Sequence, residues 1–78
     1  MEKAKEKEKY PDFAGRLKEM RAELDLRPVD LAKRAGLNRS DIHYYEKGMT
    51  SPGLHALIKL ADAFGVSLDH LVGRDPPI

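Results

Sequence analysis

The 78-residue sequence contains no cysteine and no tryptophan, and its aromatic residues are three tyrosines and two phenylalanines. Without cysteine, the fold cannot be held by a disulfide, and no thiolate metal site or cysteine nucleophile is available. No apolar run approaches the roughly 18 residues needed to cross a bilayer. The first ten residues, MEKAKEKEKY, lack the apolar centre of a secretion signal. These absences predict a cytoplasmic protein without membrane association, whose small core is formed by the packing of helices.

A strong charge of one sign is also missing. The chain has 14 basic and 13 acidic residues, which give a net charge of +1 with histidine neutral. Residues 1–10 hold four lysines and three glutamates, so the rest of the chain is neutral. Binding to nucleic acid would therefore depend on the local placement of basic side chains, because no global positive field exists.

The chain divides into three parts. Residues 1–10 are expected to be a flexible, charged lead-in, with a helical extension as the alternative because Lys and Glu favour helices. Residues 11–73 are predicted to form one all-α domain of five short helices, since no stretch alternates as a strand does. Residues 74–78 form a short tail that is too rich in proline to continue a helix.

Two stretches place apolar residues at intervals of three and four, the spacing that lines one face of a helix. The first predicts a helix over residues 12–24, and the second predicts a helix that ends at Gly65, a natural left-handed stop. The two stripes consist of Phe13, Leu17, Met20 and Leu24 in the first helix and Leu54, Leu57, Ile58, Ala61 and Phe64 in the second.

Hydrophobic staples indicate the other three helices. In a staple, an apolar residue before the N-cap pairs with an apolar residue at the fourth helical position. The pattern predicts helices over 28–35, 39–47 and 68–72, with N-caps at Arg27, Asn38 and Ser67. Asn38 and Ser67 are good caps, whereas Arg27 is a poor one that Pro28 partly compensates. The staple pairs are Leu26 with Leu31, Leu37 with Ile42, and Val66 with Leu71.

Residues 28–47 have the pattern of two helices joined by a tight turn, which holds the second helix at a steep angle to the body. Gly36 supplies the positive φ that the turn requires, and Ala32 is small where the two helices cross. A second helix held in this way fits a DNA major groove. The side chains expected to point inward are those of Leu31, Ala35, Leu37, Ile42 and Tyr45.

On these residues the sequence resembles the Cro and phage-repressor type of helix-turn-helix regulators, also called the xenobiotic response element family. The resemblance covers about residues 13–73. It implies a five-helix, lambda-repressor-like domain that acts as a transcriptional regulator, in particular a repressor. The implied partners are double-stranded DNA with a roughly palindromic operator and a second copy of the chain. The matching segments are RLKEMR at 16–21, DLAKRAGLNRSDIHYYEKG at 30–48, SP at 51–52 and LIKLADAFGVSLDHLVG at 57–73.

By position, the resemblance implies base contacts from the helix over 39–47 and phosphate contacts beside it. Arginine suits guanine, serine and histidine are more permissive, and tyrosine can contact a phosphate or a thymine methyl group. The alternative for each is an ordinary polar surface residue. The implied base contacts are Arg39, Ser40, His43 and Tyr44, and the implied phosphate contacts are Asn38, Lys47, Thr50 and Ser51.

The resemblance also implies two structural contacts. Arg21 would reach Glu46 in a partly buried ion pair that fixes the tilt of the helix over 39–47, the alternative being two solvated charges of little energetic effect. The helix over 68–72 and the tail would form the dimer contact, unless the same residues close the core of the monomer. These residues are Leu71, Val72 and Ile78.

Three residues depart from the family pattern. Pro28 replaces a common Gln and offers no donor to a phosphate or base. Asp41 could repel phosphate or accept from cytosine, although a role at the helix N-terminus together with Asn38 is favoured. Asp25 replaces the usual Gly after the helix over 12–24 and tolerates a left-handed conformation at moderate cost.

An alternative function is an antitoxin-like or adaptor module that keeps the fold and binds DNA weakly or not at all. It is favoured by the neutral net charge and by Pro28 and Asp41. The basic residues around the turn favour DNA. They are Lys33, Arg34, Arg39 and Lys47. Enzymatic activity, a cofactor, a metal and a small-molecule ligand are not expected, because the sequence has no phosphate-binding loop and no triad. The histidines also lack the short spacing of metal ligands; they are His43, His55 and His70.

Overall fold

A computed structural model describes residues 12–74. This range contains five α-helices and no strand, which confirms the predicted all-α class. None of these helices is long and apolar enough to cross a membrane. The lead-in predicted for 1–10 lies outside the described residues, as do residues 75–78 of the tail. The helices are α2 (Phe13–Glu23), α3 (Pro28–Ala35), α4 (Arg39–Lys47), α5 (Leu54–Phe64) and α6 (Leu68–Val72).

The helix bounds follow local sequence signals. The three helices predicted from staples, α3, α4 and α6, have the predicted bounds, and α5 ends before Gly65 as expected. The helix α2 is one residue shorter at each end than predicted, because Asp12 and Leu24 are its caps. After it, Asp25 takes a φ of 56°, the left-handed conformation expected where the family has glycine. The amides of both Asp25 and Leu26 return to carbonyls of α2 and close its end.

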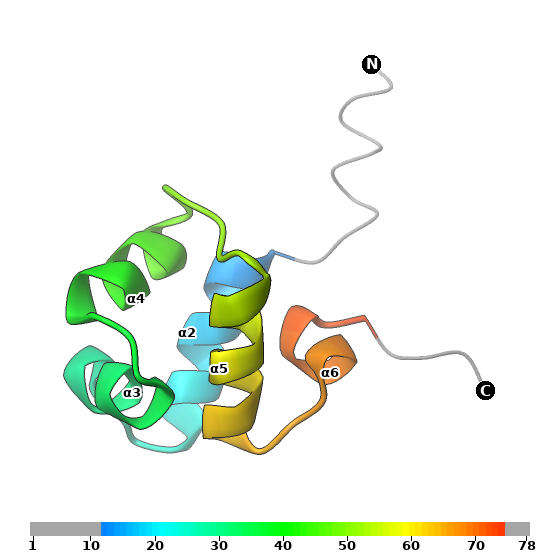
Figure 1. The fold of residues 1–78 in the computed structure, drawn as a ribbon, viewed down its shortest axis with the longest axis horizontal. Helices are drawn as coiled ribbons and strands as arrows, with labels where there is room; N and C mark the ends of the chain where they lie inside the picture. The colour runs from blue at the N-terminus through cyan, green and yellow to red at the C-terminus, as the bar shows by residue number, and fades with distance from the viewer. Residues whose placement is uncertain (1–11, 75–78) are drawn as a thin grey trace.

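The helices α3 and α4 lie on one side of the molecule and α6 lies on the opposite side, with α2 and α5 between them (Figure 1). The pair α3 and α4 packs on the central helices through contacts of α4 with α2 and of α3 with α5. Every helix therefore contributes to one core. Its buried residues are Leu17, Met20, Leu31, Ala32, Ala35, Ile42, Leu60, Ala61 and Leu71.

The predicted stripe of α2 was wrong at one residue. Leu24 is 47% exposed, because it follows the last helical residue and the chain turns away from the core there. Leu17 and Met20 are buried as the stripe requires, and Phe13 packs against the core.

The predicted stripe of α5 was wrong at two residues and missed a third. Leu54 is 64% exposed and Ile58 is 40% exposed, whereas Leu60, absent from the predicted stripe, is fully buried. The buried face is centred on residues 57, 60, 61 and 64, which follow the same three- and four-residue spacing. Because α5 is apolar on more than one face, spacing alone could not select the buried one.

The last helix closes the core of the monomer. Leu71 is fully buried, so the expectation that it forms a dimer contact is corrected. The guanidinium of Arg16 on α2 donates from Nε and Nη2 to the His70 carbonyl, at 2.8 and 2.6 Å. At the start of the helix, the Ser67 hydroxyl accepts from the His70 amide at 3.1 Å. Both ends of α6 are thus held by side-chain hydrogen bonds.

Candidate nucleic-acid interface

The turn between α3 and α4 depends on Gly36. This residue ends α3 with φ 74° and ψ 34°, and the next amide, that of Leu37, donates to the Ala32 carbonyl at 2.8 Å. A Cβ added at Gly36 would meet no atom within 4 Å, so the requirement for glycine is the positive φ and not a lack of space. Ala32 is buried, as expected from its place at the crossing.

The start of α4 is stabilised by Asp41. Its Oδ2 accepts from the backbone amide of Asn38, the N-cap residue, at 3.3 Å. The carboxylate also lies in the first turn, where it complements the positive end of the helix dipole. This geometry supports the interpretation of Asp41 as a helix-terminus residue. The Asp41 oxygen that accepts from the Asn38 amide is therefore already used within the protein.

The helix α4 has two distinct faces. Toward the body, Ile42 is fully buried, Tyr45 packs against the core, and burial raises the pKa of the Tyr45 phenol. Away from the body, Tyr44 is 42% exposed and its ring meets the His43 ring edge-on, with centroids 5.6 Å apart at 63°. The four side chains predicted to contact bases share this exposed face, since they form two adjacent pairs that lie four positions, about one helical turn, apart on α4. They are Arg39, Ser40, His43 and Tyr44.

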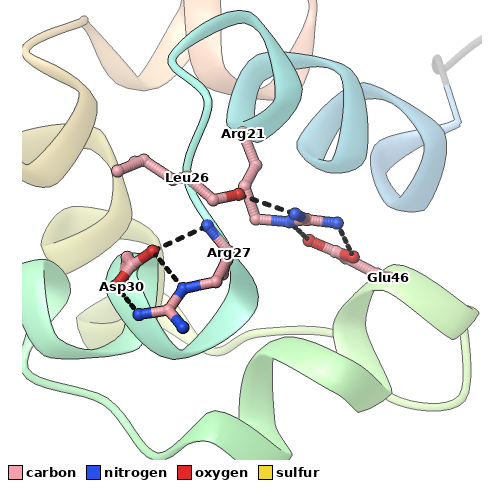
Figure 2. A network of polar contacts seen from close by, with 5 residues as sticks. All are labelled: Arg21, Leu26, Arg27, Asp30 and Glu46. Atoms are coloured by element: carbon pink, nitrogen blue, oxygen red, sulfur yellow. Dashed lines mark hydrogen bonds and ion pairs between the residues drawn. The ribbon is translucent and has the colours of Figure 1, made fainter.

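Arg21 of α2 is joined to Glu46 of α4 by an ion pair (Figure 2). The Arg21 guanidinium donates from Nε and Nη2 to the two carboxylate oxygens of Glu46, at 2.6 and 3.0 Å. Its Nη1 donates to the Leu26 carbonyl at 2.8 Å. The structure therefore contains the ion pair that the resemblance implied, and the side chains are only 17% and 9% exposed. The side-chain hydrogen bonds to Glu46 raise the pKa of Arg21, so the guanidinium stays charged.

A second ion pair, between Arg27 and Asp30, was not anticipated from the sequence. Asp30 Oδ2 accepts from the Arg27 amide and from Arg27 Nε, both at 2.9 Å, and Oδ1 accepts from Nη2 at 3.1 Å (Figure 2). Arginine cannot accept a hydrogen bond as an N-cap side chain, so Asp30 supplies the cap of α3 instead. The sequence could have indicated this contact, because Asp30 is an acidic residue three positions after the N-cap Arg27, which is the place of the acidic partner in a capping box.

This pair makes the stability of the domain depend on pH. The hydrogen bonds from Arg27, first from its side chain and then from its backbone, lower the pKa of Asp30 from 3.8 to about 2. A carboxyl whose pKa is depressed by folding adds stability above its unfolded pKa and loses it as pH falls through the folded value. The Asp30 contribution should therefore be present at pH 5 and be lost between about pH 4 and pH 2.

We expect Asp30→Asn to have a lower urea midpoint of unfolding than the unchanged protein at pH 5. The difference between the two midpoints should be smaller at pH 2. Asp62→Asn, which removes an exposed carboxylate of α5, controls for the loss of one negative charge. Urea unfolding followed by circular dichroism at both pH values measures the difference. If the difference in urea midpoint is the same at pH 5 and pH 2, the ion pair with Arg27 is not the cause of the lower stability of Asp30→Asn.

A hollow of about 420 Å³ lies between the start of α3 and the exposed face of α4. It brings all four predicted base-contact residues to one place, together with a residue of α3 and the paired carboxylate of α4. Sequence reasoning had assigned no cavity to this face. The lining residues are Pro28, Arg39, Ser40, His43, Tyr44 and Glu46.

The residues predicted to contact phosphates are exposed around α4 and in the loop after it. They are Asn38, Lys47, Thr50 and Ser51. Lys33 and Arg34, in the last turn of α3, are exposed as well. Within residues 12–74, no group of three or more His, Asp or Glu side chains is arranged to hold a metal ion.

A model of the helix-turn-helix family HTH_3 matches residues 17–71. Among curated proteins, the cryptic phage CTXphi transcriptional repressor RstR of Vibrio cholerae is 35% identical over 60 residues, 77% of this chain and 54% of RstR. This chain thus spans about half the length of that repressor. An uncharacterized HTH-type transcriptional regulator of Archaeoglobus fulgidus is 36% identical over 56 residues, 72% of this chain and 79% of that protein.

Two solved structures are similar over most of the chain. The restriction-modification controller protein C.AhdI from Aeromonas hydrophila has a TM-score of 0.74 and 33% identity, covering 77% of this chain and 91% of C.AhdI. The P22 c2 repressor in complex with synthetic operator 9T also has a TM-score of 0.74, with 28% identity, covering 81% of this chain and 96% of that repressor.

Proposed function

Because the chain belongs to the HTH_3 helix-turn-helix family of transcriptional regulators, we propose that it binds double-stranded DNA sequence-specifically and represses transcription, reading the major groove with α4. The observation that carries the proposal is the two-faced α4. Its inner face packs on the body through Ile42 and is joined to α2 by the ion pair of Glu46 with Arg21, which leaves its outer face exposed. The likeness to the P22 c2 repressor, whose structure contains an operator, also supports DNA as the ligand.

In this proposal the residues around α4 have separate tasks. Arg39, in the first turn, donates in a bidentate manner to a guanine edge, and Ser40 and His43 contact neighbouring bases. Phosphates are held by exposed donors beside the helix, which set the register of the protein on the duplex. Those donors are Asn38, Lys47, Thr50 and Ser51.

Fluorescence anisotropy with mixed-sequence duplex DNA tests the proposed function. Each phosphate contact releases counterions, so about four contacts should reduce the affinity by about 100-fold between 50 and 200 mM salt. An antitoxin-like or adaptor module, the alternative that the neutral net charge favours, should bind little at either salt concentration. Absence of binding at 50 mM salt would therefore contradict the proposed DNA-binding function and favour the antitoxin-like or adaptor function.

We propose further that the regulator binds as a homodimer to a roughly palindromic operator, with the two α4 helices about 34 Å apart. Leu71 is buried, Val72 is half-buried and Ile78 lies outside the described residues, so we place the contact on other apolar residues. Leu54 and Ile58 are one turn apart on the same exposed face of α5. Burying this pair between two copies would remove the largest apolar exposure of α5 from water.

Ile58→Glu is expected to shift the protein to the monomer, because a carboxylate would have to be buried at the contact. Sedimentation equilibrium at micromolar concentration measures the change, and an unchanged thermal melt would show that the monomer stays folded. Lys59→Glu, on the neighbouring exposed position of α5, is the matched control and should leave the dimer intact. A dimer that survives Ile58→Glu would place the contact elsewhere.

A further inference from the structure

The hollow between α3 and α4 has a chemistry that the general function does not explain. Pro28 forms its wall on the α3 side, and Tyr44 lies in its lining on the α4 side. Pro28 has neither a backbone N–H nor a polar side chain, so this wall cannot donate a hydrogen bond to a base or phosphate. The Tyr44 ring is 42% exposed and is held edge-on by His43. A proline ring and a tyrosine ring, both largely apolar, thus border an open hollow on the proposed reading face.

The carboxylate in the lining is already neutralised. Both oxygens of Glu46 accept from the Arg21 guanidinium, at 2.6 and 3.0 Å. Glu46 therefore has little need of a donor from a ligand, and the hollow does not select for a positively charged group. The donors in the lining are all on α4: Arg39 and Ser40 in its first turn, and the ring N–H of His43 and the hydroxyl of Tyr44 one turn later.

The group that fits these walls in a major groove is a methyl group. Of the four bases, thymine alone carries an apolar substituent on its major-groove edge, the C5-methyl, and an apolar protein surface recognises it without a hydrogen bond. The donors of Arg39 lie in the same hollow and are free to bind the next base pair.

We propose that Pro28 and Tyr44 form a receptor for a thymine C5-methyl group, next to the base pair that Arg39 contacts. This assignment rests on the proposed DNA binding. It makes Pro28, which has no hydrogen-bond donor, a residue that determines sequence preference. The departure from the family's common Gln then changes what is read at that position, instead of only removing a contact.

The test begins with a duplex selected by the protein from a random library. Each thymine of the selected site is replaced in turn by deoxyuridine, which lacks the methyl group and keeps every hydrogen-bonding atom. At one thymine per half-site, the replacement should weaken binding about four-fold, as expected for burial of one methyl group. Anisotropy titrations at fixed salt measure the ratio of the two dissociation constants, and uracil in the flanking sequence serves as the DNA control.

The protein variants assign the effect to the hollow. Pro28→Ser should bring the thymine-to-uracil ratio close to one, and Tyr44→Ser should do the same by removing the opposite wall. Pro52→Ser is the matched control, because it removes a proline from the loop between α4 and α5, outside the hollow, and should leave the ratio unchanged. Melting curves verify that each variant is folded at the temperature of the titration.

The possible failures can be told apart. If the unchanged protein binds DNA but is insensitive to uracil at every position, the methyl receptor is wrong and the proposed DNA binding stands. If the four-fold effect persists in both Pro28→Ser and Tyr44→Ser, the methyl group is read elsewhere on the protein. If no duplex is bound at low salt, the proposed function fails and the receptor fails with it.

Discussion

Glu46→Ala is expected to lower the melting temperature of the domain by about 10 °C. The substitution leaves the Arg21 guanidinium in a site that is only 17% exposed, with the Leu26 carbonyl as its remaining acceptor. Removing one partner of a fully buried pair costs about 3–5 kcal/mol, and partial solvent access reduces this to about 2 kcal/mol here. For a domain of this size, each kcal/mol corresponds to about 4–8 °C in melting temperature. Thermal unfolding followed by circular dichroism measures the shift.

Three variants identify the ion pair as the cause. Glu46→Gln keeps the shape of the side chain and one acceptor oxygen, so its decrease in melting temperature should be smaller than that of Glu46→Ala. The double substitution Arg21→Met and Glu46→Met removes both charges and should recover much of the stability, because no unpaired charge remains. Lys47→Ala, at the exposed neighbouring position, should melt like the unchanged protein. A shift of less than about 2 °C in Glu46→Ala would mean that the pair does not hold α4.

Helix bounds and the turn were predictable from the sequence because their causes are local. The staple and cap pattern before Ile42 and Leu71 determined where α4 and α6 begin, and Gly36 marked the end of α3. These signals involve residues within one turn of each other, so no knowledge of the rest of the fold was needed.

Burial depended on tertiary packing, which the sequence alone did not reveal. Leu54 and Ile58 have helical spacing and are nevertheless exposed, because α5 has apolar residues on more than one face and its packing against α3 and α6 leaves these two uncovered. Leu71 could have closed the core or joined two copies, and its complete burial shows that it closes the core. The contact of Arg16 with the His70 carbonyl joins residues 54 apart in sequence, with no local signal.

For the candidate site, the sequence predicted which side chains share the exposed face of α4 and did not predict the hollow beside it. The exposed face of α4 follows from helical spacing, with Ile42 pointing inward and His43 and Tyr44 outward. The hollow, however, needs Pro28 of α3 beside that face, and the distance between two helices depends on how both pack on the body. Pro28 therefore looked from the sequence like a lost contact, whereas the structure places it in the lining of a cavity.

Arg39→Ala is expected to weaken binding to the selected duplex by about 10- to 100-fold and to relax the preference at one base pair in each half-site. Arg39 lies in the first turn of α4, where a bidentate contact to guanine is worth about 1–3 kcal/mol of discrimination. The loss of affinity caused by Arg39→Ala should be small for duplexes that lack the guanine, since those duplexes do not make the contact. Anisotropy titrations against the selected duplex and its single-base-pair variants measure both effects.

Lys47→Ala separates base reading from phosphate binding. Lys47 is exposed at the end of α4, and a phosphate contact there should contribute equally to every sequence. Its removal should weaken all duplexes by a similar factor and reduce the salt dependence by about one counterion. The two substitutions remove the same unit charge from the same helix, so a general electrostatic effect would give them the same profile. If Arg39→Ala weakens every duplex as uniformly as Lys47→Ala does, Arg39 binds the DNA backbone and specificity comes from the other side chains on the exposed face of α4.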